Sequence, residues 1–391
     1  MTAADVRSRF PGLSDGWVRL DGPAGTLPVD TCIDAIADYM RSPAPANLGG
    51  SFEASRASDA VVDRARQTVG RLVGAQPDEI VFGPSTTNLM FAFTRALSRS
   101  WEPGDRIVCT QLDHDSNVSP WLLAARDVGA TVEMLEVDPV DGTLDVEPLK
   151  GLCADGRTRW VAISGASNLT GHAPDLARAA AIAHEHGARI LVDGVARVPH
   201  LPTDAAALDL DVLSTSPYKW YGPHAGVLAV RHDLLRTVEP YRVRPADYDG
   251  PARWETGTPQ IELLAGITAA AEFMLSTPVA QVSAHEIELL ALLQEGLHDI
   301  HGVTVHGPSV TPDRAPTVVF TVAGHTPLQV DEFLASRRIA VWHGDNYACE
   351  LIDALGLRAT GGTVRAGIVR YTTADDVAAL LAALTELTAG S

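Results

Sequence analysis

One lysine in this chain, Lys219, occupies a position where a charged side chain is unusual. It lies in residues 214–226 (STSPYKWYGPHAG), between apolar runs at residues 208–213 and 227–230 that resemble buried strands. Lysines normally keep their charge in water. A lysine at a strand end in a dry cleft can instead lose its proton and attack an aldehyde. The alternative is a solvated loop lysine, and the neighbouring segments must decide between the two.

A second segment has the composition of an anion-binding turn. Residues 83–88 (GPSTTN) connect a predicted strand at residues 79–82 to a predicted helix at residues 89–97. Backbone N–H groups and the positive end of a helix dipole attract an anion, and Thr86 and Thr87 add hydroxyl donors. The same residues could serve only as the N-terminal cap of the helix. The turn is therefore a candidate phosphate site with a purely structural alternative.

These residues belong to a stretch in which predicted strands and helices alternate. The strands are at residues 106–109, 131–135, 160–163 and 189–192, and the helices at residues 55–72, 121–128 and 176–186. This order predicts a mainly parallel sheet sandwiched by helices. Ligands of such sheets lie beyond the carboxyl ends of the strands. The polar residues expected at those ends, and hence around one cleft, are Ser85, Thr86, Thr87, His114, Asn168, Asp193, Ser216 and Lys219.

The two ends of the chain have other patterns. Residues 18–28 predict a short strand and a Gly/Pro-rich turn, which by itself is most typical of a connector. Beyond residues 242–257 the pattern predicts helices at 261–274, 282–300, 328–337 and 374–388, and strands at 304–305, 317–320 and 364–369. We expect a smaller α+β C-terminal domain at residues 261–391, a large domain at residues 31–260, and an N-terminal segment at residues 1–30 that joins the small domain and the active site.

Composition excludes several classes of function. The 391 residues carry a net charge of −19, which does not suit a nucleic-acid partner. No apolar run is long enough for a membrane span, and the N-terminus lacks the pattern of a secretory signal. The four cysteines are far apart and form no CxxC pair, which favours a reducing, cytoplasmic location and gives no metal-site signature.

A pyridoxal phosphate (PLP) enzyme requires a lysine, a carboxylate and an anion-binding turn. Lys219, Asp193 and residues 83–88 are the candidates for these three features. The chain resembles the class V aminotransferase group of fold-type-I PLP enzymes, and within it the cysteine desulfurase-like proteins. The motifs that carry the resemblance are residues 83–88, 111–121 (QLDHDSNVSPW), 167–171 (SNLTG), 193–194 (DG), 214–226, 256–259 (TGTP) and 364–367 (VRAG).

The resemblance implies a role for each of these positions. Lys219 would form the Schiff base with PLP and then act as the general base at the substrate Cα. Asp193 would bind the pyridine nitrogen, and His114 would stack on the ring. The implied phosphate contacts are Thr86, Thr87 and Ser216, with Asn168 on the ring hydroxyl. Thr258 would reach the phosphate of a neighbouring subunit, which implies a homodimer.

The substrate side of the motif set contains departures from the family pattern. Arg365 is expected to bind the α-carboxylate of an amino-acid substrate, with an ordinary surface arginine as the alternative. Tyr218 replaces the usual histidine before the lysine, and Tyr347 stands where desulfurases carry a nucleophilic cysteine, so it is a candidate for substrate binding. Cys349 follows two residues later at a predicted helix start. It is either a reactive thiol or a small buried hydrophobic residue.

The sequence thus predicts a PLP-dependent lyase or transferase that acts on an amino acid. C–S bond cleavage or β-elimination through an aldimine and a quinonoid is the leading hypothesis. Transamination and epimerisation by the same family are alternatives, and a non-catalytic scaffold with a PLP fold is another.

Overall fold

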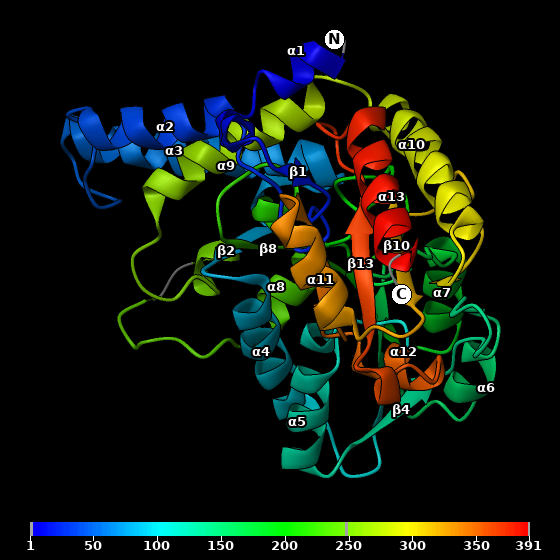
Figure 1. The fold of residues 1–391 in the computed structure, drawn as a ribbon. Coiled ribbons are helices and arrows are strands. Elements are labelled where there is room, and N and C mark those ends of the chain that lie inside the picture. Colours follow the sequence, from blue (N-terminus) through cyan, green and yellow to red (C-terminus); the bar gives the residue numbers. More distant parts are fainter. Residues whose placement is uncertain (1–2, 247–248, 390–391) are drawn as a thin grey trace.

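A seven-stranded sheet forms the centre of the computed structural model, which describes residues 3–246 and 249–389 (Figure 1). Its strands are β2 (Ile80–Gly83), β3 (Arg106–Thr110), β4 (Thr131–Leu135), β5 (Thr158–Ser164), β6 (Arg189–Asp193), β7 (Val212–Thr215) and β8 (Gly226–Val230), in the order β2-β8-β7-β6-β5-β3-β4. All neighbours pair in parallel except β8, which is antiparallel to both β7 and β2. The predicted mainly parallel sheet is confirmed.

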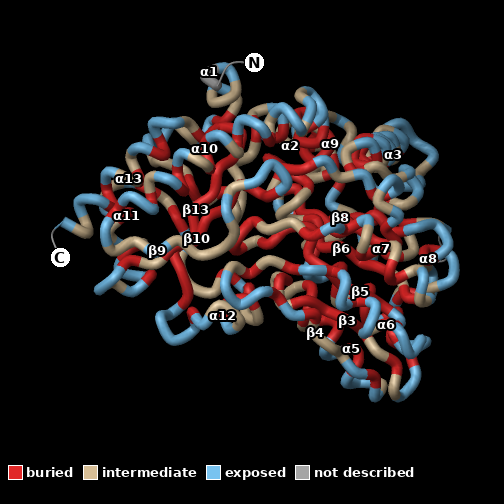
Figure 2. The backbone as a smooth tube through the Cα atoms, turned by 90° about the vertical axis from the view of Figure 1, so that its right-hand side faces the viewer, coloured by how far each residue is buried: buried red, intermediate tan, exposed pale blue. Residues whose placement is uncertain are grey.

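Helices bury both faces of this sheet. They are α2 (Asp30–Arg41), α3 (Glu53–Val73), α4 (Thr86–Leu97), α5 (Ser119–Val128), α6 (Leu149–Cys153), α7 (Leu176–Glu185), α8 (His232–Thr237) and α9 (Ile261–Leu275). Successive strand residues point to opposite faces, and accordingly Ile190 belongs to one buried apolar cluster while Leu191 belongs to the other. Figure 2 shows these strands as buried and the outer turns of the helices as exposed.

A second, antiparallel sheet lies in the C-terminal part of the chain. It contains β9 (Val303–His306), β10 (Thr317–Val322), β12 (Trp342–Gly344) and β13 (Thr363–Gly367), in the order β12-β13-β10-β9. Helices α10 (Val279–Asp299), α11 (Pro327–Ser336) and α13 (Ala374–Ala389) pack on it around one apolar cluster, with the short α12 (Cys349–Ala354) nearby. The prediction of an antiparallel sheet backed by helices agrees with this arrangement.

The N-terminal segment joins this second sheet region rather than the central sheet. After α1 (Ala3–Arg7), β1 (Val18–Arg19) pairs in parallel with β11 (Ile339–Ala340). A single bridge then links Asp21 to Gly367 at the end of β13. The division of the chain at residues 1–30, 31–260 and 261–391 stays a prediction, although β1 lies where that division expects it.

Some element boundaries differ from those predicted. Helix α3 ends at Gly74, where a left-handed φ of 67° allows the predicted stop. Helix α4 begins at Thr86, three residues earlier than its apolar pattern indicates, because its first turn carries the polar residues of the candidate anion site. Helix α2 is not predicted.

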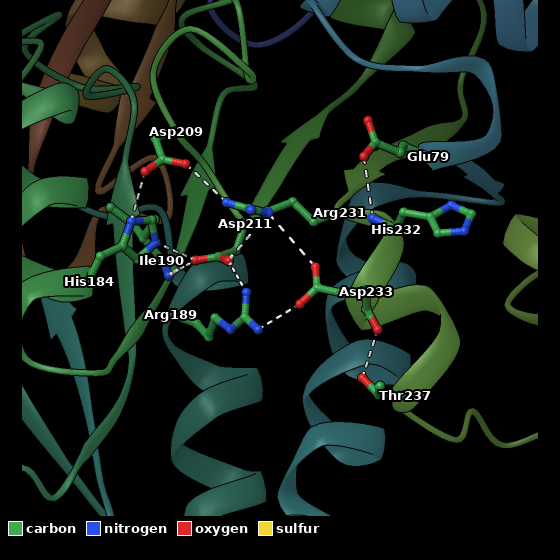
Figure 3. Close-up of polar contacts among 10 residues, drawn as sticks. All are labelled: Glu79, His184, Arg189, Ile190, Asp209, Asp211, Arg231, His232, Asp233 and Thr237. Atoms are coloured by element: carbon green, nitrogen blue, oxygen red, sulfur yellow. Dashed lines mark hydrogen bonds and ion pairs between the residues drawn. The ribbon is translucent and has the colours of Figure 1, made fainter.

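A charged network fixes the amino-terminal edge of the central sheet (Figure 3). The buried carboxylate of Asp211, just before β7, accepts hydrogen bonds from Arg189 (2.6 Å) and from the backbone N–H of Ile190 (2.8 Å). Arg189 donates to Oδ1, whereas Oδ2 accepts from Ile190 and also lies 2.8 Å from Nε2 of His184. Asp211 thereby ties the starts of β6 and β7 to helix α7, and the opposite edge of the sheet is left for the site.

No single helix among residues 3–246 and 249–389 is long and apolar enough to cross a membrane. Helices α9 and α10 pass that test only as a pair, and they are bent by 77° at their junction. Helix α9 is packed inside the protein, because Gly266 faces Ile36 and Cys32 of α2.

Candidate active site

A cavity of about 480 Å³ lies beyond the carboxyl ends of the central strands. Among its lining residues are nine of the predicted site residues, namely Thr86, Thr87, His114, Asn168, Asp193, Ser216, Lys219, Tyr347 and Arg365. They come from segments separated by almost 280 positions of sequence, from Thr86 on α4 to Arg365 on β13. The chain therefore gathers most of the predicted site in one place.

Lys219 ends a short 3-10 turn (Pro217–Lys219) that follows β7. Its Nζ donates a hydrogen bond to the main-chain oxygen of Pro23 and lies 5.2 Å from the ring centre of Tyr218. Burial lowers the pKa of Lys219 to about 7, Arg365 adds to the lowering, and Asp193 opposes it. A large share of Lys219 is therefore neutral near pH 7, as a nucleophilic or basic amine requires.

The anion turn directs the hydroxyl of Thr86 at the end of β7. Ser85 caps helix α4 by accepting a hydrogen bond from the N–H of Asn88 at 3.1 Å, which leaves the next residues to other contacts. The hydroxyl of Thr86 donates to the main-chain oxygen of Thr215 at 2.9 Å and lies 2.6 Å from the hydroxyl of Ser216. The first turn of a helix with these hydroxyls at its N-terminus suits a phosphate group.

Gly226 makes this arrangement possible. A Cβ atom at this first residue of β8 would lie 2.2 Å from the carbonyl carbon of Ser85 and 2.3 Å from the backbone nitrogen of Thr86. Only glycine lets β8 approach the start of α4 so closely. Gly226, the last residue of the segment that contains Lys219, thus positions the anion turn.

Asp193 is the last residue of β6 and is buried. Its Oδ1 accepts hydrogen bonds from the N–H of Val195 at 3.0 Å and from the hydroxyl of Ser214 at 3.2 Å. Burial raises the pKa of Asp193, while these hydrogen bonds and Lys219 act in the opposite direction. A cationic ring nitrogen would stabilise this carboxylate further, because opposite charges in a buried site favour the ionised form.

His114 is held in one orientation by its neighbour Ser116. The backbone N–H of Ser116 donates to Nδ1 of His114 at 3.0 Å, and the Ser116 hydroxyl lies 2.8 Å from the same atom. Burial lowers the pKa of His114 to about 4, with further lowering by Lys219 and Arg365. The ring is therefore neutral at physiological pH, which suits a stacking partner. It already stacks on Tyr347, with ring centres 5.2 Å apart at 27°.

Asn168 and Arg365 connect the central sheet to the C-terminal sheet. Nη1 of Arg365 donates to the main-chain oxygen of Asn168 at 2.9 Å, and Nδ2 of Asn168 donates to the main-chain oxygen of Asn346 at 2.8 Å. Burial lowers the pKa of Arg365 to about 10, so it stays cationic at neutral pH. Arg365 is buried, which rules out the alternative of an ordinary surface arginine.

One buried atom in the cavity wall lacks a partner. Oδ1 of Asn168 is buried and accepts no hydrogen bond from the residues that the structure describes. Such an atom is costly unless a ligand or water satisfies it. A ring hydroxyl would supply the missing donor, so the asparagine, the hydroxyl-rich turn and the neutral lysine together fit PLP.

Two predicted features lie outside this cavity. Thr258 lines a second cavity of about 380 Å³ with Pro84 and Glu255, and a single chain does not bring it to Lys219. Cys349 begins α12 as predicted, but it is absent from the residues that line the first cavity. Burial and the nearby Asp345 raise the pKa of Cys349, which does not support a reactive thiolate.

Several site residues carry no recognisable sequence signal of their own. The turn at residues 22–28, which looks like a connector, instead places Pro23 against Lys219 and Ala24 in the cavity wall. Trp342 and Asn346 line the cavity because β12 pairs with β13, and that pairing is not visible in the local sequence. The Gly-Pro-Ala-Gly composition of residues 22–25 was the only available hint.

The described residues contain no group of three or more His, Cys, Asp or Glu side chains placed to hold a metal ion.

The helix-covered sheet with a second α+β unit, and the buried lysine, aspartate and anion turn at its carboxyl edge, define a fold-type-I PLP-dependent enzyme. A family model described as aminotransferase class-V matches residues 18–380. The chain therefore belongs to the class-V aminotransferase family, and the sequence-based predictions of family, fold class and PLP cofactor are confirmed.

Cysteine desulfurases are among its most similar relatives. Cysteine desulfurase CsdA of Escherichia coli K12 is 31% identical over 395 residues, which cover 97% of this chain and 96% of that protein. Its crystal structure matches with a TM-score of 0.90 at 29% identity over 99% of both chains. The apo cysteine desulfurase of Thermococcus onnurineus NA1 matches with a TM-score of 0.94 at 27% identity, over 99% of this chain and 98% of that chain.

Proposed function

We propose that this PLP enzyme cleaves the C–S bond of a cysteine-derived amino acid by β-elimination. One observation carries the choice of reaction. Lys219, Asp193 and Arg365 line the cavity, whereas no cysteine does among the residues that the structure describes. Tyr347 lies in the cavity wall at the position where sequence spacing places the nucleophilic cysteine of desulfurases. Sulfur is then better released as a free thiol than transferred to the enzyme.

The cofactor residues act by holding charge and moving one proton. Thr86, Thr87 and Ser216 would bind the phosphate, and Lys219 would hold the cofactor covalently. Bound PLP draws electrons away from the substrate Cα and makes its proton acidic. With the substrate bound, the neutral amine of Lys219 would be the base that removes the Cα proton. Asp193 would keep the ring nitrogen charged, and neutral His114 would cover the ring.

The substrate residues orient the amino acid for that step. The buried guanidinium of Arg365 would bind the α-carboxylate through two parallel hydrogen bonds. With the carboxylate fixed there, the Cα–H bond would be accessible to Lys219, which lines the same cavity, and loss of this proton would allow the Cβ–S bond to break. The overall reaction takes one thioether amino acid and one water and yields a thiol, pyruvate and ammonium.

Other reactions of the same cofactor remain alternatives to be separated by products. Transamination would consume a keto acid, epimerisation would change only the configuration at Cα, and a scaffold protein would give no product. We expect cysteine, S-substituted cysteines and cysteine sulfoxides to give pyruvate and ammonium when no keto acid is added as a co-substrate. Product analysis by mass spectrometry tests this. If the products are instead alanine and an enzyme persulfide, and if both are lost in Cys349→Ala, then the protein is a desulfurase.

We further propose that the enzyme works as a cytoplasmic homodimer. Thr258 lies away from Lys219 within one chain, so its predicted phosphate contact requires a second copy. All four cysteines are unpaired, which suits a reducing compartment. Mixing Lys219→Ala chains with Thr258→Ala chains tests the shared site, because a mixed dimer has one site with both defects and one with neither. Partial recovery of activity is expected, and no recovery would contradict the contact across the interface.

A further inference from the structure

We propose that the mouth of the cavity selects amino acids whose β-carbon carries a thioether to an aromatic group, and that Trp342 and Tyr347 make this selection. The inference rests on the proposed C–S cleavage and adds the class of substrate side chain. Both aromatic residues line the cavity, and both are largely exposed, at 51% for Trp342 and 68% for Tyr347.

Strand pairing places Trp342 beside the residue that binds the substrate carboxylate. Trp342 on β12 is directly opposite Arg365 on β13 in an antiparallel ladder. Residues opposite each other in such a ladder point to the same face of the sheet, with their Cβ atoms about 5 Å apart. Arg365 faces the cavity, and so does Trp342. A substrate held at Arg365 therefore has the indole ring next to it.

The next residue of β12, His343, also lines the cavity, but one of its ring nitrogens is engaged by another element. His343 is paired with the buried Val364, and its Nδ1 lies 2.8 Å from the carboxylate of Asp331 on α11. The strand thus gives the cavity the indole ring of Trp342, while Nδ1 of His343 is held by Asp331 on α11.

Tyr347 is held at the cavity by an unusual backbone. Asn346 and Tyr347 both have left-handed φ angles, 52° and 59°. Two contacts keep them there. The N–H of Asp115 donates to the oxygen of Tyr347 at 2.8 Å, and Asn168 donates to the oxygen of Asn346. Non-glycine residues persist in this conformation only where the surroundings impose it, and such sites are often functional.

The remaining groups of this loop are engaged with one another. Oδ1 of Asp345 accepts the N–H of Tyr347 at 3.0 Å, and Nδ2 of Asn346 donates to the oxygen of Gly344 at 3.2 Å. What the loop offers a substrate side chain is therefore chiefly aromatic surface. Two exposed aromatic rings are best covered by another ring, because aromatic pairs add to the gain from burial alone.

The reaction that follows from this selection is balanced with one water as the only other reactant. For S-benzyl-L-cysteine, the Cα proton goes to Lys219, the Cβ–S bond breaks with its electron pair on sulfur, and the thiolate takes up a proton as benzyl thiol. The three-carbon unit that remains is hydrolysed by one water to pyruvate and ammonium. No electron donor or acceptor is consumed.

Two ligand pairs test the selection on the PLP-loaded enzyme. Binding is measured with L-phenylalanine and L-alanine, which have no C–S bond, from the change in cofactor absorbance. Cleavage is measured with S-benzyl- and S-methyl-L-cysteine, whose leaving groups are both alkyl thiols. We expect the aromatic member of each pair to be favoured by roughly tenfold or more, in Kd and in kcat/KM respectively. Equal values within each pair would overturn the inference.

Substitutions assign the preference to the two residues. Trp342→Ala and Tyr347→Ala should each remove most of it, which is measured as a fall in the ratio of the aromatic to the non-aromatic ligand within each pair, in Kd and in kcat/KM. Trp342→Phe and Tyr347→Phe keep a ring and should keep the preference, which controls for disturbance of the loop. A preference that survives both alanine substitutions would overturn the assignment.

The two arms also separate this inference from the proposed function. Preferential binding of phenylalanine without thiol release from any thioether would support the aromatic mouth and contradict C–S cleavage. Thiol release from S-methyl- and S-benzylcysteine at equal kcat/KM would support cleavage and contradict the aromatic mouth.

Discussion

The side-chain amide of Asn168 donates a hydrogen bond to the main-chain oxygen of Asn346 at 2.8 Å, which joins the turn after β5 to the loop after β12. The other amide atom, Oδ1, is buried and has no partner within the described part of the chain. Asn168 therefore links the two sheets through its Nδ2 atom. Its Oδ1 atom is an unpaired hydrogen-bond acceptor in the wall of the cavity.

Asn168→Ala should weaken PLP binding and loosen the loop. Loss of a buried hydrogen bond costs about 1–3 kcal/mol, which corresponds to an increase in the Kd for PLP of roughly 5- to 150-fold. Equilibrium titration of the apoprotein with PLP measures it. Asn346→Gly is the matched control, because it keeps the main-chain oxygen and tolerates the left-handed φ. Equal Kd values for Asn168→Ala and the wild type would contradict the role given to Asn168.

The pKa of Lys219 predicts how PLP capture depends on pH. Since burial and Arg365 lower this pKa from 10.5 to about 7, the amine is mostly protonated and unreactive below pH 7 and mostly neutral above it. The rate constant for PLP capture should rise about tenfold per pH unit below pH 7 and level off above about pH 8. Stopped-flow absorbance measures it. A rate that keeps rising to pH 10 would show an ordinary lysine.

Arg365→Lys should impair substrate binding more than cofactor binding. A lysine cannot reproduce the planar guanidinium that holds a carboxylate at two points, and it would leave the oxygen of Asn168 without its donor. KM should rise by roughly 10- to 100-fold, with the Kd for PLP within about twofold of the wild type. The control is Arg126→Lys, at an arginine whose side chain is 71% exposed on α5. An unchanged KM would remove Arg365 from the substrate site.

Asp211→Asn should destabilise the protein and leave the reaction intact. The Asp211 side chain is fully buried and accepts hydrogen bonds from Arg189 and Ile190 (Figure 3). Removing its charge should lower the apparent free energy of unfolding in urea by about 1–3 kcal/mol, with kcat unchanged because the site is at the other edge of the sheet. Asp209→Asn, at a 65% exposed carboxylate of the same network, should cost under about 1 kcal/mol. An equal loss of unfolding free energy in Asp211→Asn and Asp209→Asn would contradict the role given to the burial of Asp211.

Much of the fold and most of the site were predictable from local sequence. Strand β6 is a short apolar run that ends in Asp193, and helix α3 has apolar residues at helical spacing and a glycine stop, so both patterns can be recognised without tertiary information. The position of Lys219 follows from its place between two such runs. These features depend on chain periodicity and on the chemistry of single motifs.

What the sequence could not predict depends on contacts between distant segments. Trp342 faces the cavity because β12 is aligned with β13. Pro23 meets Lys219 because its turn is hydrogen-bonded to the lysine segment, where Thr26 donates to the main-chain oxygen of Tyr218. Nothing in residues 22–25 indicates a lysine almost 200 positions away. The left-handed backbone at Tyr347 is likewise imposed by hydrogen bonds from other elements, since tyrosine itself disfavours it.

The most direct test of the account is to locate PLP on the chain. The sequence contains only two lysines, Lys150 and Lys219, so Lys150 is an internal control; its side chain is 48% exposed and paired with Glu147. The PLP-loaded protein is reduced with sodium borohydride, digested and analysed by mass spectrometry. The account predicts a pyridoxyl phosphate group on the peptide that contains Lys219, none on the peptide of Lys150, and no label in Lys219→Ala. Label on Lys150 alone, or on neither lysine, would contradict it.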